Sequence, residues 1–516
     1  MEPLYDVIVV GAGNGGLVAA GTTAKNGYKT LLLEKNNVPG GCATSFRRGR
    51  FEFEPSLHEL SGVGVPGNRE YVYDILNGLG AEVDWRYEKN MFRAIVTGPD
   101  GYDVTVRSGI KGFCESVDEV VPGSYKKVIK LFKLAMHDAK ALDYITRKKG
   151  KPNKLWMAMC YGNFMRAASH TVEEVEIAPG IPEKARNIVN TYWCYLGVPT
   201  DELNCMHYLN MLRSYVQFGA AMPAKRSHEI SEAFVKAIRN FGGEVWFNSK
   251  VTGFLSDNSG RITGVEVNGK KIYAREVISN IIPNNVFNMM DSASIPQTDL
   301  KLANSREFGV SVMTIYLGLD CTREELGIND YTTFIMNNQN PRVQHDTNGL
   351  YIVNCLNTVI PESSPKGTCT LFFTTLCYGK DFPKDVNPQD YKKYKNQIAE
   401  KYISEYEKLI GKDIHSHIEE IAVATPATFA RYLDTPDGTI YGYKLSDWDN
   451  LMSRVAHEAK EYTIPGLSFV GGHHIRGDGY CSAYYTGSFI GSRVVRKLKA
   501  ADEAKKEHVA AGEASK

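Results

Sequence analysis

The 516-residue chain lacks the features that define several classes of protein. Its ten cysteines include no C-x-x-C pair, and such scattered cysteines favour reduced thiols over a zinc site or a disulfide framework. Sixty basic residues balance fifty-nine acidic ones, so no excess charge is available to hold nucleic acid. No stretch reaches the roughly 18 to 20 apolar residues of a membrane-spanning helix, and the opening MEPLYDVIVVG lacks the pattern of a signal peptide. These absences predict a cytoplasmic protein whose only membrane contact would be peripheral.

The start of the chain has the pattern of a dinucleotide-binding turn. The apolar run at 4–10 predicts a strand, and Gly11-Ala-Gly13-Asn-Gly-Gly16 opens an alanine-rich segment that predicts a helix. Gly11 would permit the turn, Gly13 would let a pyrophosphate approach the backbone, and Gly16 would let the helix pack on the strand. A second predicted strand ends at Glu34, which is placed to accept hydrogen bonds from ribose hydroxyls.

A second match to the same glycine pattern lies at 62–67, in GVGVPG. No strand precedes it, Pro66 would obstruct a helix, and no second strand ending in an acid follows. We therefore expect a loop at 62–67 and one dinucleotide site, at the start of the chain.

The pair Gly40-Gly41, which begins six residues after Glu34, indicates which dinucleotide the turn would bind. An acid, five residues, Gly-Gly and then an aromatic-rich strand resembles the FAD-binding oxidoreductases of the amine oxidase and phytoene desaturase type. Within that superfamily the chain looks most like the branch that holds phytoene desaturases, carotenoid isomerases and retinol saturase. Its resemblance is carried, beyond the first turn, by the stretches at 40–60, 223–255, 425–443 and 471–487.

The resemblance implies an α/β fold with two interleaved parts. A Rossmann-like FAD-binding domain of the glutathione reductase/amine oxidase type would be assembled from residues 1–75, 220–290 and 455–500. An α+β substrate domain would contain 76–219 and 291–454, and 501–516 would be a polar tail, frayed or disordered. The implied cofactor is FAD, and its implied contacts are Gly11, Gly13, Gly15, Gly16, Glu34, Lys35, Gly41, Cys42, Ala43, Thr44, Val251, Gly472, His473, Asp478, Gly479 and Tyr480.

Two adjacent histidines, His473 and His474, lie among glycines in GGHHIRGDGYCSAYYTG. Side chains at i and i+1 diverge, so a metal site would need a third ligand from elsewhere. In the resembling family this loop and the following helix surround the pyrimidine end and ribityl chain of FAD, so we expect a flavin loop and no metal. The family commonly has an acid where this chain has His473, which leaves the ribityl partner open.

Two residues are candidates for the chemistry. The resemblance places His58 near the flavin, although a core histidine satisfied by hydrogen bonds fits the sequence equally well. Lys225 and Arg226 precede a predicted N-cap at Ser227, and cations at a helix N-terminus oppose its macrodipole, which suggests an offsetting anion. We expect Arg226 to hold a substrate carboxylate; the alternative is an exposed basic pair bound to water. Cys42 is expected to contribute packing rather than redox chemistry.

Residues 126–154 predict a basic amphipathic helix, with apolar positions at helical spacing and an aromatic and Met-rich segment after it. Such a stretch, extended over 126–165, could dock on an anionic membrane where an apolar substrate is stored. The alternative is a solvated helix that covers the substrate domain.

The resemblance predicts an FAD-dependent oxidoreductase that saturates or desaturates carbon-carbon bonds of an extended apolar polyene, such as a carotenoid, a retinoid or a polyunsaturated fatty acid. Two alternatives stay open. One is a redox-neutral, flavin-dependent double-bond isomerase. The other is a prenyl-lipid escort protein that shares the fold without catalysis.

Overall fold

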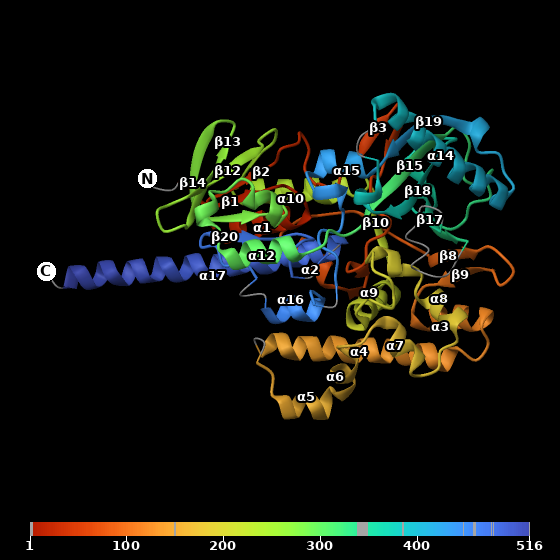
Figure 1. Cartoon of the computed structure of the whole chain (residues 1–516), viewed down its shortest axis with the longest axis horizontal. Coiled ribbons are helices and arrows are strands. Elements are labelled where there is room, and N and C mark those ends of the chain that lie inside the picture. Colours follow the sequence, from red (N-terminus) through yellow and green to blue (C-terminus); the bar gives the residue numbers. More distant parts are fainter. Residues whose placement is uncertain are drawn as a thin grey trace.

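The computed structural model describes residues 4–148, 151–337, 349–383, 386–446, 448–457, 461–475, 477 and 479–514. Two large sheets lie side by side along the long axis of the molecule, and a group of helices covers the lower edge of the second sheet in Figure 1.

The first sheet contains the predicted dinucleotide turn. Its strand order is β11-β2-β1-β14-β13-β12, with β20 paired to β14. The pairs β11/β2, β2/β1, β1/β14 and β14/β20 are parallel, whereas β12, β13 and the first half of β14 form an antiparallel meander. The strands are β1 (Tyr5–Val10), β2 (Thr30–Leu33), β11 (Glu244–Trp246), β12 (Val251–Ser256), β13 (Ile262–Val267), β14 (Lys270–Ser279) and β20 (Leu467–Phe469).

Alternating side chains of β1 bury both faces of this sheet. Val7 and Val9 pack against a layer formed by α1 (Asn14–Lys25), α10 (His228–Asn240) and α17 (Gly479–Ala514). Ile8 and Val10 pack on the other face, under the helices α11 (Pro283–Phe287) and α12 (Gln297–Ser305). Because both faces are covered, the central parallel strands β1 and β2 are mostly apolar.

The second sheet has the order β19-β15-β18-β17-β16-β8-β9, and only its β16/β8 pair is parallel. One face packs on α14 (Pro388–Ile410), and the other packs on the helical group and borders the first sheet. Its strands are β8 (Asn90–Val96), β9 (Tyr102–Arg107), β15 (Ser311–Leu319), β16 (Thr332–Met336), β17 (Leu350–Cys355), β18 (Cys369–Cys377) and β19 (Ile418–Ala424).

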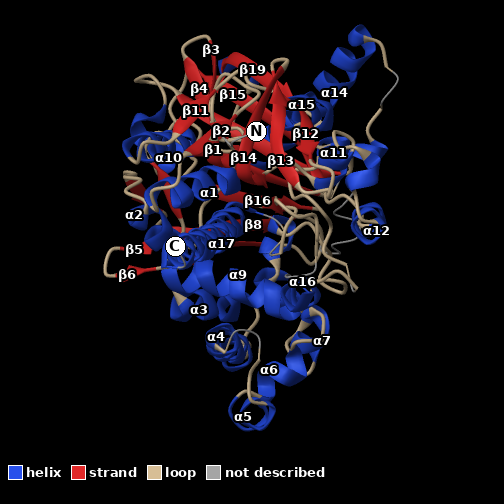
Figure 2. Cartoon of the chain, turned by 90° about the vertical axis from the view of Figure 1, so that its left-hand side faces the viewer, coloured by secondary structure: helices blue, strands red, loops and turns tan. Residues whose placement is uncertain are grey.

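The helical group comes from residues 110–218 and lies in the lower part of the molecule in Figure 2. Its members are α3 (Ile110–Val120), α4 (Tyr125–Arg147), α5 (Lys154–Cys160), α6 (Gly162–Ala167), α7 (Val172–Ile177), α8 (Glu183–Val189) and α9 (Cys205–Phe218). The predicted basic helix is α4, and its apolar positions Val128, Leu131, Phe132 and Ala135 are buried against the second core. Among the residues described, no helix is both long and apolar enough to cross a bilayer.

Two short hairpins, one further pair of short strands and three more α-helices lie outside the two sheets and the helical group. The glycine pattern at 62–67 forms a tight hairpin between β5 (Gly64–Val65) and β6 (Asn68–Arg69), not a second dinucleotide turn. The other small pairs are β3 (Phe46–Arg48) with β4 (Phe51–Phe53) and β7 (Trp85–Tyr87) with β10 (Ala221–Pro223). The helices are α2 (Tyr71–Gly78), α15 (Pro426–Leu433) and α16 (Leu451–His457).

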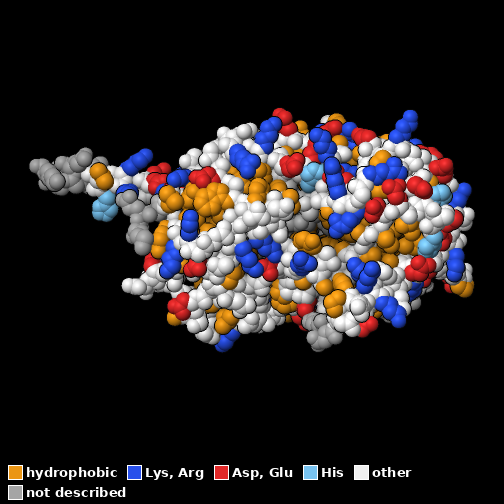
Figure 3. Space-filling model, turned by 90° about the horizontal axis from the view of Figure 1, so that it is seen from above, with side chains coloured by type: hydrophobic (Ala, Val, Ile, Leu, Met, Phe, Trp, Pro, Cys, Tyr) orange, Lys and Arg blue, Asp and Glu red, His pale blue; other side chains and the backbone are white. Residues whose placement is uncertain are grey.

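The C-terminal tail differs from the expectation. A frayed tail was predicted from residue 501, but α17 runs without a break to Ala514 and projects beyond the body in Figure 1. Its alanine, lysine and glutamate are strong helix formers. Lys497 binds Glu276 at 2.8 Å, and Arg275 binds Asp502, so the tail starts from a helix already anchored to the first sheet. Figure 3 shows basic and acidic side chains interspersed over the face seen from above, as the balanced composition requires.

Candidate functional site

A cavity of about 870 Å³ lies where the carboxyl ends of the parallel strands meet the second sheet. Val10, Leu33 and Asn280, at or just beyond the ends of β1, β2 and β14, line it. This edge is where open α/β sheets bind ligands. The volume is in the upper part of the range of about 300 to 1,000 Å³ that small-molecule sites occupy.

The glycines of the first turn form one wall of the cavity. Gly13 is the N-cap of α1, and Gly11, Gly13, Asn14 and Gly15 line the space. Gly11 has a φ of +92°, which favours glycine. Gly16 lies outside the cavity, where an added Cβ would come within 2.0 Å of the Gly11 carbonyl oxygen, so it serves the contact between helix and strand.

Glu34 fixes this turn as well as facing the cavity. Its Oε2 accepts a hydrogen bond from the Ala12 N–H at 2.8 Å, and its Oε1 accepts one from the Asn36 N–H at 2.8 Å. Burial raises the pKa of Glu34, and these two backbone donors oppose that rise. Lys35 and Val251 line the same end of the cavity.

The Gly-Gly turn closes over the first turn. The Gly40 N–H donates to the Ala12 carbonyl at 2.7 Å, and Gly40, Gly41 and Cys42 line the cavity. Burial raises the pKa of the Cys42 thiol to about 11, so it is protonated at neutral pH.

The predicted cofactor contacts Ala43 and Thr44 are not among the lining residues. Their carbonyl oxygens accept hydrogen bonds from the Ser231 hydroxyl at 2.7 Å and the Ser227 hydroxyl at 3.1 Å. The chain has turned away from the cavity at this point, so these two residues attach the Gly-Gly turn to α10.

The two adjacent histidines diverge. His473 lines the cavity with a buried Nε2 that has no hydrogen-bond partner among the described residues. Burial, together with nearby Arg306 and Arg454, lowers its pKa to about 3. His474 lies outside the cavity, with its Nε2 3.3 Å from Glu461. Among the residues described, no group of three His, Cys, Asp or Glu side chains could hold a metal.

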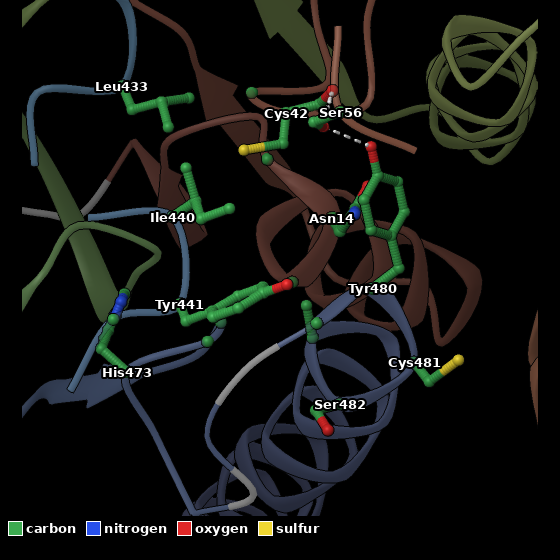
Figure 4. Close-up of a pocket in the computed structure, with 18 of the residues that line it drawn as sticks. Asn14, Cys42, Ser56, Leu433, Ile440, Tyr441, His473, Tyr480, Cys481 and Ser482 are labelled. Atoms are coloured by element: carbon green, nitrogen blue, oxygen red, sulfur yellow. Dashed lines mark hydrogen bonds between the residues drawn. The ribbon is translucent and has the colours of Figure 1, made fainter. Parts of the chain in front are cut away.

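Three of the four other predicted residues of this loop line the cavity. Gly472, Gly479 and Tyr480 line the cavity, and the Tyr480 hydroxyl lies 3.1 Å from the Ser56 hydroxyl (Figure 4). Asp478 lies outside the described residues.

A buried ion-pair network supports the histidine loop from behind. Arg306 makes a bidentate contact with Asp449, 2.8 Å at each bond, and lies 2.6 Å from Glu461. Arg454 also binds Asp449, at 2.7 and 3.0 Å, and donates to the His474 carbonyl at 3.4 Å. All these charged side chains are buried. Sequence reasoning missed the network because its members lie far apart along the chain.

The second sheet and the helical group supply the apolar half of the cavity. The second sheet contributes Val312, Thr314, Leu350, Ile352, Thr374 and Leu376, α4 contributes Ala139, Leu142 and Asp143, and α9 contributes His207, Asn210, Met211, Arg213, Ser214 and Tyr215. The sheet side of this half is mostly apolar, as an extended hydrocarbon ligand requires, and α9 adds polar side chains to the helical side.

His58 faces this half and is also satisfied by a hydrogen bond. Its Nδ1 lies 2.7 Å from Asn354 Oδ1, while Asn354 Nδ2 donates to Thr332 Oγ1 at 2.9 Å. Asn354 therefore accepts at Oδ1, so His58 carries its proton on Nδ1. Burial lowers the pKa of His58 to about 4, and the ring is neutral at physiological pH.

The role predicted for Arg226 is wrong in this geometry. Its side chain is buried outside the cavity, donates to the Ser363 carbonyl and lies 3.7 Å from Glu52. The offsetting anion belongs to the chain and is Glu52. Glu54, whose pKa burial raises to about 7, accepts hydrogen bonds from the Ser227 N–H and hydroxyl, both at 2.8 Å, at the start of α10. Glu52 and Glu54 occupy the place assigned to a substrate carboxylate.

Asn280 is a site residue that sequence reasoning did not identify. It follows β14, and its side chain lies against Gly13, Gly15 and Gly471, where an added Cβ would come within 2.5 to 2.9 Å of its amide. The position after a buried strand was the available signal, but the pairing of β14 beside β1 is visible only in the fold.

Comparison with known proteins confirms the fold. A model of NAD(P)-binding Rossmann-like domains matches residues 9–79. An oxidoreductase from Methanosarcina mazei superposes with a TM-score of 0.63 at 17% identity, covering 94% of this chain and 99% of that one. A putrescine oxidase with putrescine bound superposes with a TM-score of 0.61 at 14% identity, covering 95% and 99%.

Similar sequences confirm the predicted resemblance to retinol reductases and prolycopene isomerases. An all-trans-retinol 13,14-reductase from Rattus norvegicus is 25% identical over 482 residues, 85% of this chain and 77% of that protein. A chloroplastic prolycopene isomerase from Daucus carota is 23% identical over 513 residues, 96% of this chain and 80% of that protein.

Proposed function

We propose that the chain is an FAD-dependent oxidoreductase that saturates or desaturates a carbon-carbon double bond of an extended apolar polyene. The observation that carries the proposal is one continuous cavity with two kinds of wall. The glycine turns and Glu34 line one end, and mostly apolar side chains of the second sheet, together with α4 and α9, line the other. The similarity to a retinol reductase, over 85% of this chain, supports carbon-carbon bond chemistry rather than amine oxidation.

FAD fits the residues present. The N-terminus of α1 has no acidic residue in its first turn, and an added Cβ at Gly13 would fill the space beside it. Free N–H groups at such a helix end bind phosphate. Two features favour FAD over a nicotinamide dinucleotide. One is the Gly-Gly turn that closes over Gly13, and the other is the buried Nε2 of His473, which has no partner among the described residues.

In this proposal three pieces of the chain, near 1–75, 220–290 and 455–500, form the cofactor unit, and the remainder forms the substrate unit. Bound FAD would exchange hydride with the substrate. The protein holds the polyene against the second sheet and excludes water. The neutral His58 adds a hydrogen-bond acceptor at Nε2 without a charge.

The proposal predicts a yellow purified protein from which FAD is released on denaturation. With a panel of retinoids, carotenoids and polyunsaturated fatty acids, mass spectrometry should show a product that differs from its substrate by two hydrogens. A product of unchanged mass with a moved double bond would instead support the isomerase. Colourless protein that binds a prenyl lipid would support an escort protein.

We also propose that α5 and α6 dock on an anionic membrane. Leu155, Trp156 and Met159 on α5 and Met165 on α6 are at least half exposed, and Figures 1 and 2 both place α5 at the outer edge of the helical group. Exposed Lys148, Lys151 and Lys154 flank them. The neighbouring helix α4 lines the cavity with Ala139 and Leu142, so a docked surface would lie near the substrate half.

Replacing Leu155, Trp156 and Met159 together with serine should reduce binding to vesicles of phosphatidylcholine and phosphatidylserine at least about tenfold, since each buried apolar side chain contributes about 1.5 to 3 kcal/mol. Vesicle sedimentation measures the bound fraction. Ile421→Ser removes an exposed apolar side chain from β19 and serves as the control. Equal binding by the triple variant and the parent would contradict the docking surface.

A further inference from the structure

Two carboxyl groups meet beside the apolar half of the cavity. Glu59, next to His58, lines the cavity and accepts a hydrogen bond from the Tyr195 hydroxyl at 2.7 Å. Its second oxygen, Oε2, and both carboxylate oxygens of Glu88 are buried, and none of the three accepts a hydrogen bond within the part of the chain that the structure describes. The side chains of Glu59 and Glu88 nevertheless interact directly with each other.

Within the described residues, neither carboxyl of this pair forms an ion pair with a Lys, Arg or His. The titratable groups that face the pair are Tyr192, Tyr195, Tyr215, Tyr331, Cys194 and the adjacent His58. The tyrosines and the cysteine are neutral because burial raises their pKa values, and His58 is neutral because burial lowers its own.

Two acceptor-only carboxylates in contact require a proton between them, because like charges so close in a dry site cannot both ionise. Burial raises the pKa of Glu59 to about 7 and that of Glu88 well above its ordinary value. The pair therefore keeps at least one proton at neutral pH, next to the space where a polyene would lie.

We propose that Glu59, supported by Glu88 and Tyr195, is the catalytic residue that exchanges a proton with a substrate carbon; this rests on the function proposed above. His58 cannot take this role at neutral pH, because its ring holds only the tightly bound Nδ1 proton. Glu59 has both a proton to give and access to the cavity.

The chemistry balances in both directions. In saturation, Glu59 gives its proton to one carbon of the double bond while the other carbon receives hydride from the reduced flavin. Two C–H bonds form, the π bond breaks, and the flavin is oxidised. The Glu59 carboxylate then shares the Glu88 proton until solvent restores the second one. In desaturation each transfer is reversed.

The test uses the flavin-loaded protein and the isosteric variant Glu59→Gln. We expect turnover to fall about 100-fold or more, the usual contribution of a general acid, with flavin content and absorbance unchanged. Infrared difference spectra of parent against variant at pH 7 should show loss of a carboxylic-acid C=O band that shifts in heavy water. In the saturating direction the parent rate should fall as pH rises through the pKa of the pair, and in the desaturating direction it should rise.

The matched control is Glu176→Gln. Glu176 is another buried acid, with a pKa raised by burial to about 8 and a hydrogen bond from Asn190 at 2.7 Å, but it lies outside the cavity. This variant should lose its own acid band and keep its turnover. Tyr195→Phe keeps the ring and removes the hydroxyl that binds Glu59, so it should shift the pH profile even if Glu59→Gln fails to fold.

Two results would overturn the proposal. One is turnover of folded Glu59→Gln within about threefold of the parent, because the loss of a general acid has a much larger effect. The other is an unchanged pH profile in Tyr195→Phe. A parent that changes no polyene by two hydrogens would refute the proposed function itself, and the infrared band would then still show whether the pair holds its proton.

Discussion

Gly13→Ala should fold normally and lose FAD affinity by about two orders of magnitude, because a methyl group that overpacks a close contact costs roughly 1 to 3 kcal/mol or more. Gly13 has a φ of −74°, so the backbone accepts alanine without strain. The added Cβ would come within 2.5 Å of the Asn280 amide nitrogen, the movable end of a side chain. The same methyl group would stand where a pyrophosphate must approach the backbone.

Flavin absorbance per protein, measured after gel filtration and FAD titration, checks this result. Gly78→Ala is the matched control, since no atom lies within 4 Å of its added Cβ at the end of α2, and it should keep its flavin. Gly16→Ala should behave differently from both. Its Cβ would come within 2.0 Å of the Gly11 carbonyl oxygen, so it should destabilise the fold itself. Full flavin content in folded Gly13→Ala would contradict the phosphate turn.

Local sequence patterns predicted the first turn because one short segment contains the whole dinucleotide-binding motif. Strand, glycines, helix and acid lie within residues 5–34, and backbone geometry alone fixes their relation. The divergence of His473 and His474 followed from their adjacency in the same way, before either partner was known.

Pairwise contacts between distant segments could not be read from the sequence. Arg226 was assigned a substrate because its offsetting anion, Glu52, lies more than 170 residues earlier in the chain. The Glu59 and Glu88 pair was missed for the same reason: nothing in either segment shows that β7, β8 and the loop before β5 bring the two carboxyls together. Burial, not motif, gives these residues their properties.

The helix dipole correctly predicted an anion at the start of α10 but not which molecule supplies it. Cations before α10 did require an anion, and the structure supplies one in Glu52, 3.7 Å from Arg226. The dipole argument fixes the sign of the partner but not its source. A carboxylate of the chain and the carboxylate of a bound acid satisfy it equally, so only the positions of the side chains could decide.

The largest loss of stability is expected from Asp449→Asn. Asp449 binds both Arg306 and Arg454, whose side chains are 2% and 0% exposed. Asparagine keeps one acceptor oxygen but no charge, so Arg454 loses the carboxylate that binds it and keeps neutral acceptors, among them the carbonyls of His474 and Lys444 at 3.4 Å each. Loss of one partner from a buried ion pair costs about 3 to 5 kcal/mol, because the remaining charge stays desolvated. Urea unfolding of the flavin-free variant measures this loss in the free energy of unfolding.

Asp84→Asn removes a carboxylate from an exposed pair with Arg86 and is the control, with an expected cost below about 1 kcal/mol. The same network supports the loop of His473, so Asp449→Asn should also release flavin at a lower urea concentration than that at which the protein unfolds. Release and unfolding at one concentration would mean that the loop and the core are a single cooperative unit. A variant as stable as Asp84→Asn would show that Glu461 alone holds both arginines, because it already lies 2.6 Å from Arg306.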